Sequence, residues 1–226
     1  MCRYSNLLNT IVVLLMLTGS ALASGILPGD SNAYIQGDQL FYNYYTGSRE
    51  INAVVEYAVY APLSLGNSFE NTFGEVAEIG DDDWVYAYQI FSNASPDANE
   101  ISAFTVGLNG GDELPIYIGS IVDTSIPNTT PPSDNYFVQT PPDPPVSAKW
   151  NFVDTENNDA GIPNDGGVSD ILFFTSPFGP ETDYASLMHT RGCTSTLPSP
   201  VPEPATLHML IIIALSLMFR RVACKY

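Results

Sequence analysis

The feature that most constrains the fold is an alternation of side chains with period two. It is clearest over residues 84–91, where one face carries Trp84, Tyr86, Tyr88 and Ile90 and the other carries Val85, Ala87 and Gln89. Successive side chains of a β-strand point to opposite faces, whereas an amphipathic helix needs a repeat of 3.6 residues. The central part of the chain therefore predicts strands, and it holds no convincing amphipathic helix.

Seven further segments show strand signals: Gln39–Tyr45, Ile51–Tyr60, Ile101–Leu108, Leu114–Val122, Tyr136–Gln139, Ala148–Val153 and Ile171–Thr175. Turn-forming residues over 93–99 separate two of the strands, which predicts that 84–91 and 101–108 form a hairpin or lie close in one sheet. About eight strands with loops of mixed length predict an all-β fold, an antiparallel β-sandwich of the immunoglobulin-like or jelly-roll type. Each strand is expected to bury one face.

The first 23 residues have the pattern of a secretory signal peptide. Arg3 gives a weak positive start, Ile11–Leu17 is an apolar stretch, and Ala21-Leu22-Ala23 is a small-x-small cleavage site. We therefore expect an N-terminal signal helix over 1–23 that is removed after Ala23.

The body between the two ends is strongly acidic. It keeps 24 acidic residues and only three basic ones, Arg49, Lys149 and Arg191, for a net charge of −21. Nucleic acid is an implausible partner, because phosphates need a basic face. Of the three cysteines only Cys193 lies in this body, so an internal disulfide is not expected.

The C-terminal stretch combines a short motif, an apolar segment and a basic end. The motif is Val201-Pro202-Glu203-Pro204-Ala205-Thr206, a hydrophobic helix is expected from about Ala205 to Phe219, and Arg220-Arg221 follow. The apolar run is shorter than the roughly 20 residues that cross a bilayer, although it can still insert with the arginines on the cytoplasmic side. Before it, residues 194–200 are rich in Ser, Thr and Pro and predict a linker.

These tail residues closely resemble the PEP-CTERM sorting signal, a tail that is also labelled an ice-binding protein C-terminal domain. The resemblance covers only the last 20 to 25 or so residues, with Val201, Pro202, Glu203, Pro204, Ala205, Thr206, Arg220 and Arg221 as the matching positions. It implies processing near the Pro-Glu-Pro motif by an exosortase-type membrane protease. The chain then divides into a signal peptide (1–23), a β-sandwich domain (24–193), a linker (194–200) and a sorting signal with its helix (201–221).

Two acidic loops deserve comparison with calcium sites. Asp81-Asp82-Asp83 precedes the strand at Trp84, and a second polar loop runs over residues 154–170. Counted from Asp154, the second loop has Asp159 where a calcium loop needs glycine and Asp165 where it needs a bidentate glutamate. Solvated turns explain both loops more simply, so no metal or cofactor is expected.

No catalytic constellation is visible in the body. His189 is its only histidine, and no nucleophile-elbow or phosphate-loop motif accompanies it. Exposed tyrosines could stack on sugar rings, although strand faces also favour them; the candidates are Tyr44, Tyr45, Tyr60, Tyr117 and Tyr136.

These observations predict an exported, non-enzymatic protein of the cell envelope or the extracellular polysaccharide matrix. Its expected partners are the export machinery, an exosortase-type protease and exopolysaccharide, and its hydrophobic helix holds it in the membrane before processing. The alternative is a carbohydrate-binding module, calcium-dependent or not. A hydrolase that uses unrecognised carboxylates is the third hypothesis, and a pair of buried carboxylates facing each other in a cleft would favour it.

Overall fold

The computed structural model describes ten stretches of the chain: residues 27–45, 48–62, 69–73, 79, 83–95, 98–108, 117–138, 147–153, 161–189 and 192–200. They form a short 3-10 helix, a short α-helix and ten strands. The helices are η1 (Leu27–Gly29) and α2 (Phe69–Phe73). The strands are β1 (Ile35–Tyr45), β2 (Ser48–Tyr60), β3 (Trp84–Ser92), β4 (Ala103–Gly107), β5 (Ile118–Ile121), β6 (Asp134–Val138), β7 (Ser147–Asn151), β8 (Ile171–Ser176), β9 (Pro180–Met188) and β10 (Gly192–Pro200).

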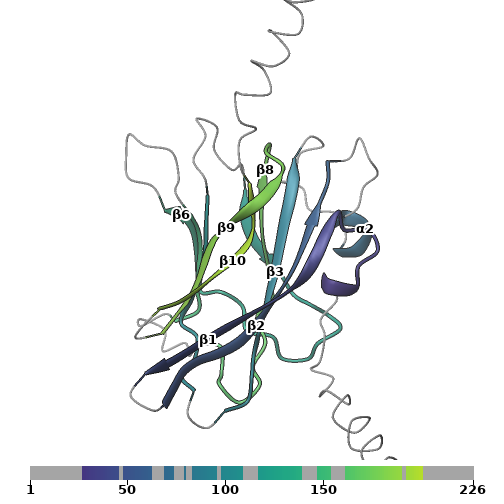
Figure 1. The fold of residues 1–226 in the computed structure, drawn as a ribbon. Helices are drawn as coiled ribbons and strands as arrows, with labels where there is room; N and C mark the ends of the chain where they lie inside the picture. The colour runs from purple at the N-terminus through teal and green to yellow at the C-terminus, as the bar shows by residue number, and fades with distance from the viewer. Residues whose placement is uncertain are drawn as a thin grey trace, which may run out of the picture.

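The strands make two antiparallel sheets of five strands each (Figure 1). The first sheet has the order β1-β2-β3-β8-β5 and the second the order β10-β9-β4-β7-β6. An all-β antiparallel architecture is thus confirmed, and each of the eight predicted strands overlaps an observed one. The predicted pairing of β3 with β4 is wrong, because β3 pairs with β2 and β8 whereas β4 pairs with β7 and β9 in the other sheet.

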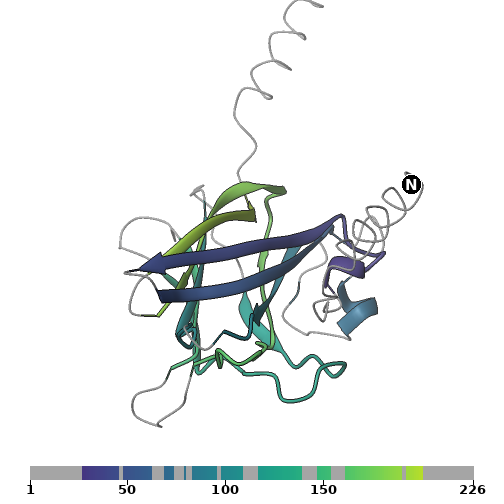
Figure 2. The same cartoon turned by 60° about the horizontal axis from the view of Figure 1, so that its bottom comes forward.

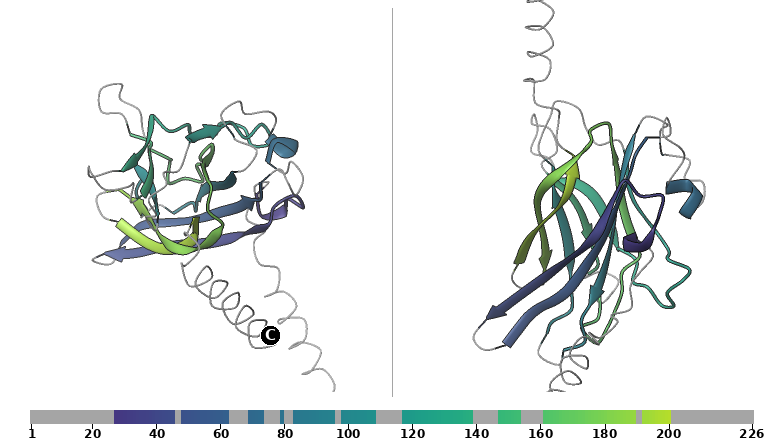
Figure 3. Two further views of the ribbon diagram at one scale, coloured as in Figure 1. Left: turned by 90° about the horizontal axis from the view of Figure 1, so that it is seen from above. Right: turned by 45° about the vertical axis from the view of Figure 1, so that its right-hand side comes forward.

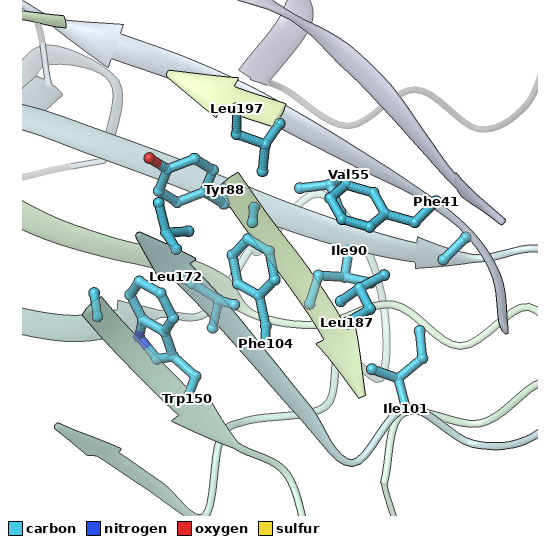
Figure 4. Close-up of a cluster of buried hydrophobic side chains, with 14 of the residues drawn as sticks. Phe41, Val55, Tyr88, Ile90, Ile101, Phe104, Trp150, Leu172, Leu187 and Leu197 are labelled. Atoms are coloured by element: carbon cyan, nitrogen blue, oxygen red, sulfur yellow. The ribbon is translucent and has the colours of Figure 1, made fainter. Parts of the chain in front are cut away.

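One hydrophobic core lies between the two sheets and draws side chains from both (Figure 4). Tyr88, Phe104 and Trp150 are fully buried there, and their rings pack within about 6 Å of one another. The polar ends of two of these rings are satisfied by backbone: Tyr88 donates to the Pro198 carbonyl over 2.5 Å, and the Trp150 indole donates to the Gly119 carbonyl over 3.0 Å. Burial raises the pKa of Tyr88 well above its ordinary value, so its hydroxyl stays protonated and donates.

A second, smaller core covers part of the outer face of the first sheet. It unites Val85, Ala87 and Phe173 with Leu27 of η1 and Phe69 of α2, and both helices lie together on this side of the body (Figure 1). Strands β3 and β8 are therefore buried on both faces, from Val85 to Ser92 and from Ile171 to Ser176. The expectation that each strand buries one face is wrong for these two strands.

The carboxylate of Asp30 connects the two short helices to the first sheet by hydrogen bonds. Asp30, which follows η1, accepts hydrogen bonds from the Tyr60 hydroxyl over 2.8 Å and from Thr72 Oγ1 over 2.6 Å. Its other oxygen accepts from the Asn32 amide over 2.9 Å. Burial, and then the bond to Asp30, raise the pKa of Tyr60, which keeps this hydroxyl a donor. The N-terminal turn, β2 and α2 are thereby joined at one point.

The predicted linker over residues 194–200 is wrong, because these residues belong to β10. β10 pairs with β9 along its whole length, from Gly192 opposite Met188 to Pro200 opposite Pro180. Leu197 is fully buried in the main core. Prolines are tolerated here because β10 is the edge strand of its sheet and needs ladder bonds on one side only.

The β9–β10 hairpin also brings the two sheets together along one side of the body. β10 lies against β1 (Figure 2), and the Asn43 side chain donates to the Gly192 carbonyl over 3.3 Å. Two further views show the same hairpin beside β1 and β2 (Figure 3). Edge strands of both sheets thus shield each other here.

The two terminal segments expected to be helical, 1–23 and 201–221, lie outside the described residues. Within the part of the chain that the structure does describe, neither helix has the length and apolar character needed to cross a membrane.

A matched pair of substitutions tests the place of β10 in the fold. Leu197→Ala is expected to lower the free energy of unfolding by about 2–5 kcal/mol, because it empties a fully buried position. Thr196→Ala, at the exposed neighbouring position, is expected to change it by about 0.5 kcal/mol or less. Urea unfolding followed by tryptophan fluorescence measures both. Equal midpoints for the two variants would show that these residues do not belong to the core.

Candidate functional site

The outer face of the second sheet is the most distinctive surface of the described body, and we call it the open face. Burial alternates along its strands, as in β7, where Ala148 and Trp150 are buried and Ser147, Lys149 and Asn151 are partly exposed. The same alternation in β4 turns Phe104 and Val106 to the core. Both short helices pack on the other sheet, so neither covers this one.

Strand register places the residues of the open face in rows that cross the sheet. One row joins Thr194 to Ser186, Thr105, Lys149 and Tyr136 across β10, β9, β4, β7 and β6. The next row contains Thr196 opposite Tyr184 on β10 and β9. Its other members are Gly107 opposite Ser147 on β4 and β7, and Val138 opposite Ser147 on β6. Between β9 and β6 the two rows carry the small residues Thr105, Gly107 and Ser147 together with Lys149, and we call these four residues the floor.

Two exposed tyrosines stand at either side of this floor. Tyr184 of β9 is 73% exposed and Tyr136 of β6 is 38% exposed. β4 and β7 lie between their strands, so the two residues are separated by about 14 Å across the sheet, from three strand spacings of about 4.8 Å. Aromatic rings at this distance can contact two different units of one extended ligand.

Lys149 supplies a positive charge next to one of the rings. Its ammonium nitrogen lies 5.7 Å from the centre of the Tyr136 ring. A cation over the face of a tyrosine ring is attracted by the electrons of the ring, which fixes the relative position of the two groups. Among the three basic residues of the body it is the one whose side chain the structure describes.

Gly107 keeps the floor low beside Tyr184. A Cβ atom at this position would lie 2.7 Å from Asp183 Oδ2 and 2.9 Å from the Tyr184 carbonyl oxygen, which is closer than atoms tolerate. Asp183 in turn accepts a hydrogen bond from the Tyr184 amide over 2.7 Å. A side chain at residue 107 would therefore disturb the strand that presents Tyr184.

The tyrosines that the sequence suggested as sugar contacts have different surroundings in the structure. Tyr60 is fully buried, and Tyr117 packs on Phe173. Tyr136 is exposed on the open face, whereas the side chains of Tyr44 and Tyr45 lie outside the described part. The sequence did not indicate Tyr184, because strand β9 itself was not predicted. The alternation of Ala185 and Leu187, which are buried, with Tyr184 and Ser186 is the pattern that could have indicated it.

The other sequence candidates do not join a described site. His189 is exposed, and Cys193 is buried, which raises the pKa of its thiol and disfavours the reactive thiolate. Asp83 is buried, while Asp81, Asp82 and residues 154–160 lie outside the described part. The described residues include no group of three or more His, Cys, Asp or Glu side chains placed to hold a metal ion.

The sorting-motif positions Val201, Pro202, Glu203, Pro204, Ala205, Thr206, Arg220 and Arg221 also lie outside the described residues. Comparisons with protein-family models, with curated proteins and with solved structures find no match to this chain.

Stability measurements test whether the rings of the open face are free for function. Tyr184→Ala is expected to change the free energy of unfolding by about 0.5 kcal/mol or less, because the ring is mostly exposed. Tyr88→Ala is expected to lower it by about 3–5 kcal/mol, because that ring is fully buried and its hydroxyl is hydrogen-bonded. A large loss from Tyr184→Ala in urea unfolding would assign that ring to the folded framework instead.

Proposed function

We propose that the protein is an exported, non-enzymatic component of the cell envelope or extracellular matrix, and that its open face binds polysaccharide. The observation that carries the binding role is the pair of exposed tyrosines, Tyr184 and Tyr136, on either side of a floor of Thr105, Gly107, Ser147 and Lys149. Sugar rings present apolar C–H faces to aromatic side chains and hydroxyl groups to polar ones, and this face offers both.

The length of the face suits a chain of sugars more than a single one. The two tyrosine strands lie about 14 Å apart, from three strand spacings of about 4.8 Å, so a ligand that contacts both rings must be extended. The floor between them has no deep hollow built by large side chains, because Thr105, Gly107 and Ser147 are all small. An extended polysaccharide lying across the strands fits this shape.

Export and sorting rest on the two ends of the chain. The signal peptide over 1–23 and the resemblance of 201–221 to the PEP-CTERM signal support passage through the export machinery, membrane retention by the hydrophobic helix, and processing by an exosortase-type protease. A body with a net charge of −21 stays soluble outside the cell and repels nucleic acid.

A hydrolase is the less favoured function. Two buried carboxylates, Asp123 and Asp170, do lie near each other, but they are only 4% and 3% exposed. Their oxygens accept hydrogen bonds from Ser125, Thr129 and Gln89. A glycosidase needs its carboxylates to contact the scissile bond, and a substrate cannot reach this pair.

For the finer topology we infer a jelly-roll arrangement over an immunoglobulin-like one. β3 pairs with β8 in one sheet and β4 pairs with β7 in the other. At the edges β5 approaches β6 and β1 approaches β10. Along the chain the pair β5–β6 lies inside β4–β7, which lies inside β3–β8, which lies inside β1–β10. This nesting is what folding one long β-hairpin into two sheets produces, and it is typical of the jelly roll.

Binding to insoluble and soluble polysaccharides tests the open face. Tyr184→Ala and Tyr136→Ala are each expected to weaken binding at least tenfold, because each removes one stacking platform. Tyr42→Ala is the matched control, since Tyr42 is 42% exposed but lies on the outer face of the first sheet. Glycan arrays followed by affinity electrophoresis provide the measurement. Equal binding by all three variants and the wild type would exclude the open face.

Replacing Pro202, Glu203 and Pro204 together by alanine tests the sorting role. The variant is expected to lose surface delivery and to keep its C-terminal tail, because the motif that the protease recognises is gone. Cell fractionation and mass spectrometry of the mature C-terminus measure both effects in a cell that contains an exosortase. Unchanged processing would contradict the sorting proposal and leave the glycan proposal to its own experiment.

A further inference from the structure

Two buried carboxylates lie together at one end of the first sheet, where β5 ends and β8 begins. Asp123 follows β5 and Asp170 precedes β8, and the pairing of β5 with β8 brings the two positions together. Their exposed fractions are 4% and 3%. A buried negative charge is normally paired with a cation or coordinates a metal, because leaving water is costly.

Neither carboxylate has a cationic partner among the described residues. Asp123 Oδ1 accepts from the Ser125 amide over 2.8 Å and from the Ser125 hydroxyl over 2.5 Å, and its Oδ2 accepts from Gln89 Nε2 over 3.1 Å. Asp170 Oδ1 accepts from the Thr129 hydroxyl. All these donors are neutral, so the charges of the pair remain uncompensated. Burial, and in addition the charge of Asp123, raise the pKa of Asp170, although the bond from Thr129 opposes this.

An unpartnered polar atom lies at the same place. Gln89 is fully buried on β3, and its side-chain oxygen Oε1 has no hydrogen-bond donor within reach. The other end of the same carboxamide, Nε2, contacts both Asp123 Oδ2 at 3.1 Å and the Ser169 carbonyl oxygen at 3.2 Å. Turning the carboxamide by 180° does not give Oε1 a hydrogen-bond donor, because it would then face Asp123 Oδ2 and the Ser169 carbonyl oxygen, which are both acceptors.

A cation would compensate the charges of the two carboxylates and would bind the oxygen of the Gln89 carboxamide once that oxygen is turned toward Asp123. Placed between the carboxylates and the turned carboxamide, it would contact oxygens of Asp123, Asp170 and Gln89 and the carbonyl of Ser169. Calcium accepts six to eight oxygen ligands, including amide and backbone carbonyls, with water completing the shell. The described residues bring no three carboxylate, His or Cys side chains together, so a metal that requires such a set is disfavoured.

The backbone around the pair is already held in place. The Thr130 amide donates to the Val168 carbonyl over 2.7 Å, and the Asp170 amide donates to the Thr130 carbonyl over 2.9 Å. Ser169 Oγ accepts from the Ile90 amide over 2.9 Å, which fixes this segment to β3. The oxygens therefore come from three segments whose relative positions are set before any ion binds.

We propose that Asp123, Asp170 and Gln89, with the Ser169 carbonyl, form a calcium site that stabilises the first sheet by clamping the loop after β5 to the start of β8. The site takes Ser169 and Asp170 from the end of the polar loop over 154–170, but its other ligands come from β3 and from the loop after β5, and it includes no residue of 81–83. It lies on the opposite layer from the open face, so its role is in folding and not in contact with glycan.

Thermal unfolding of the full chain in detergent tests the site, with calcium chloride titrated after removal of metal by EGTA. The unfolding midpoint of the wild type is expected to rise by about 5–10 °C at calcium a hundredfold above the dissociation constant. The buffer contains 0.15 M NaCl, which screens diffuse binding to the acidic surface. An equal rise with magnesium, or no rise with calcium, overturns the proposal.

Variants locate the effect. Asp170→Asn and Asp123→Asn are expected to lose the calcium-dependent rise, whereas Asp134→Asn, at an exposed position of β6, keeps it. In EGTA, Asp170→Asn is expected to be at least as stable as the wild type, because the amide retains an acceptor for Thr129 and removes a buried charge. A rise that survives in both site variants places the ion elsewhere and overturns the proposal.

Calcium binding by the wild type alone supplies a test that does not depend on how the variants fold. Competition with a chelator of known affinity is expected to show one tight site per chain at 0.15 M NaCl. Only weak binding that disappears as the salt concentration rises would contradict a built site.

Discussion

The body depends on a central strand that is buried on both faces. β3 pairs with β2 on one side and β8 on the other, and its side chains enter two different cores. Tyr88 and Ile90 contact the main core between the sheets, while Val85 and Ala87 contact the small core under η1 and α2. Because apolar burial contributes about 25 cal/mol per Å², a strand that buries both faces contributes more than any edge strand can. The fold needs no disulfide for this reason.

This arrangement leaves the two sheets with different outer surfaces. The outer face of the first sheet is occupied by the short helices, by Asp30 with its three donors and by the loop that carries Asp123. The second sheet keeps an outer face on which Thr105, Gly107, Ser147 and Lys149 lie between two exposed tyrosines. The described helices therefore cover part of the first sheet, and neither of them covers the outer face of the second.

The sequence predicted the strands where apolar and polar residues differ strongly, as in β3 and β2. It missed β9 and β10, since Ser, Thr and Pro dominate β10 and its inward positions include only Leu197 as a large apolar residue. Pairing between distant strands could not be read from any local pattern, and the β3–β4 hairpin was wrong for that reason. The sequence offered Tyr136 as a tyrosine that could contact sugar, and this residue is exposed. It did not indicate that Asp123 lies near Asp170, because the two residues are 47 positions apart and no motif connects them.

The end of β10 has a consequence for the tail that follows it. The strand remains paired and buried up to Pro200, and the Val-Pro-Glu-Pro sequence begins at the next residue. No linker residue therefore separates the last paired residue of the sheet, Pro200, from the proposed sorting motif. On the processing that we propose, a membrane protease that cuts there must either accommodate a rigid domain at the mouth of its active site or act before the last hairpin has closed.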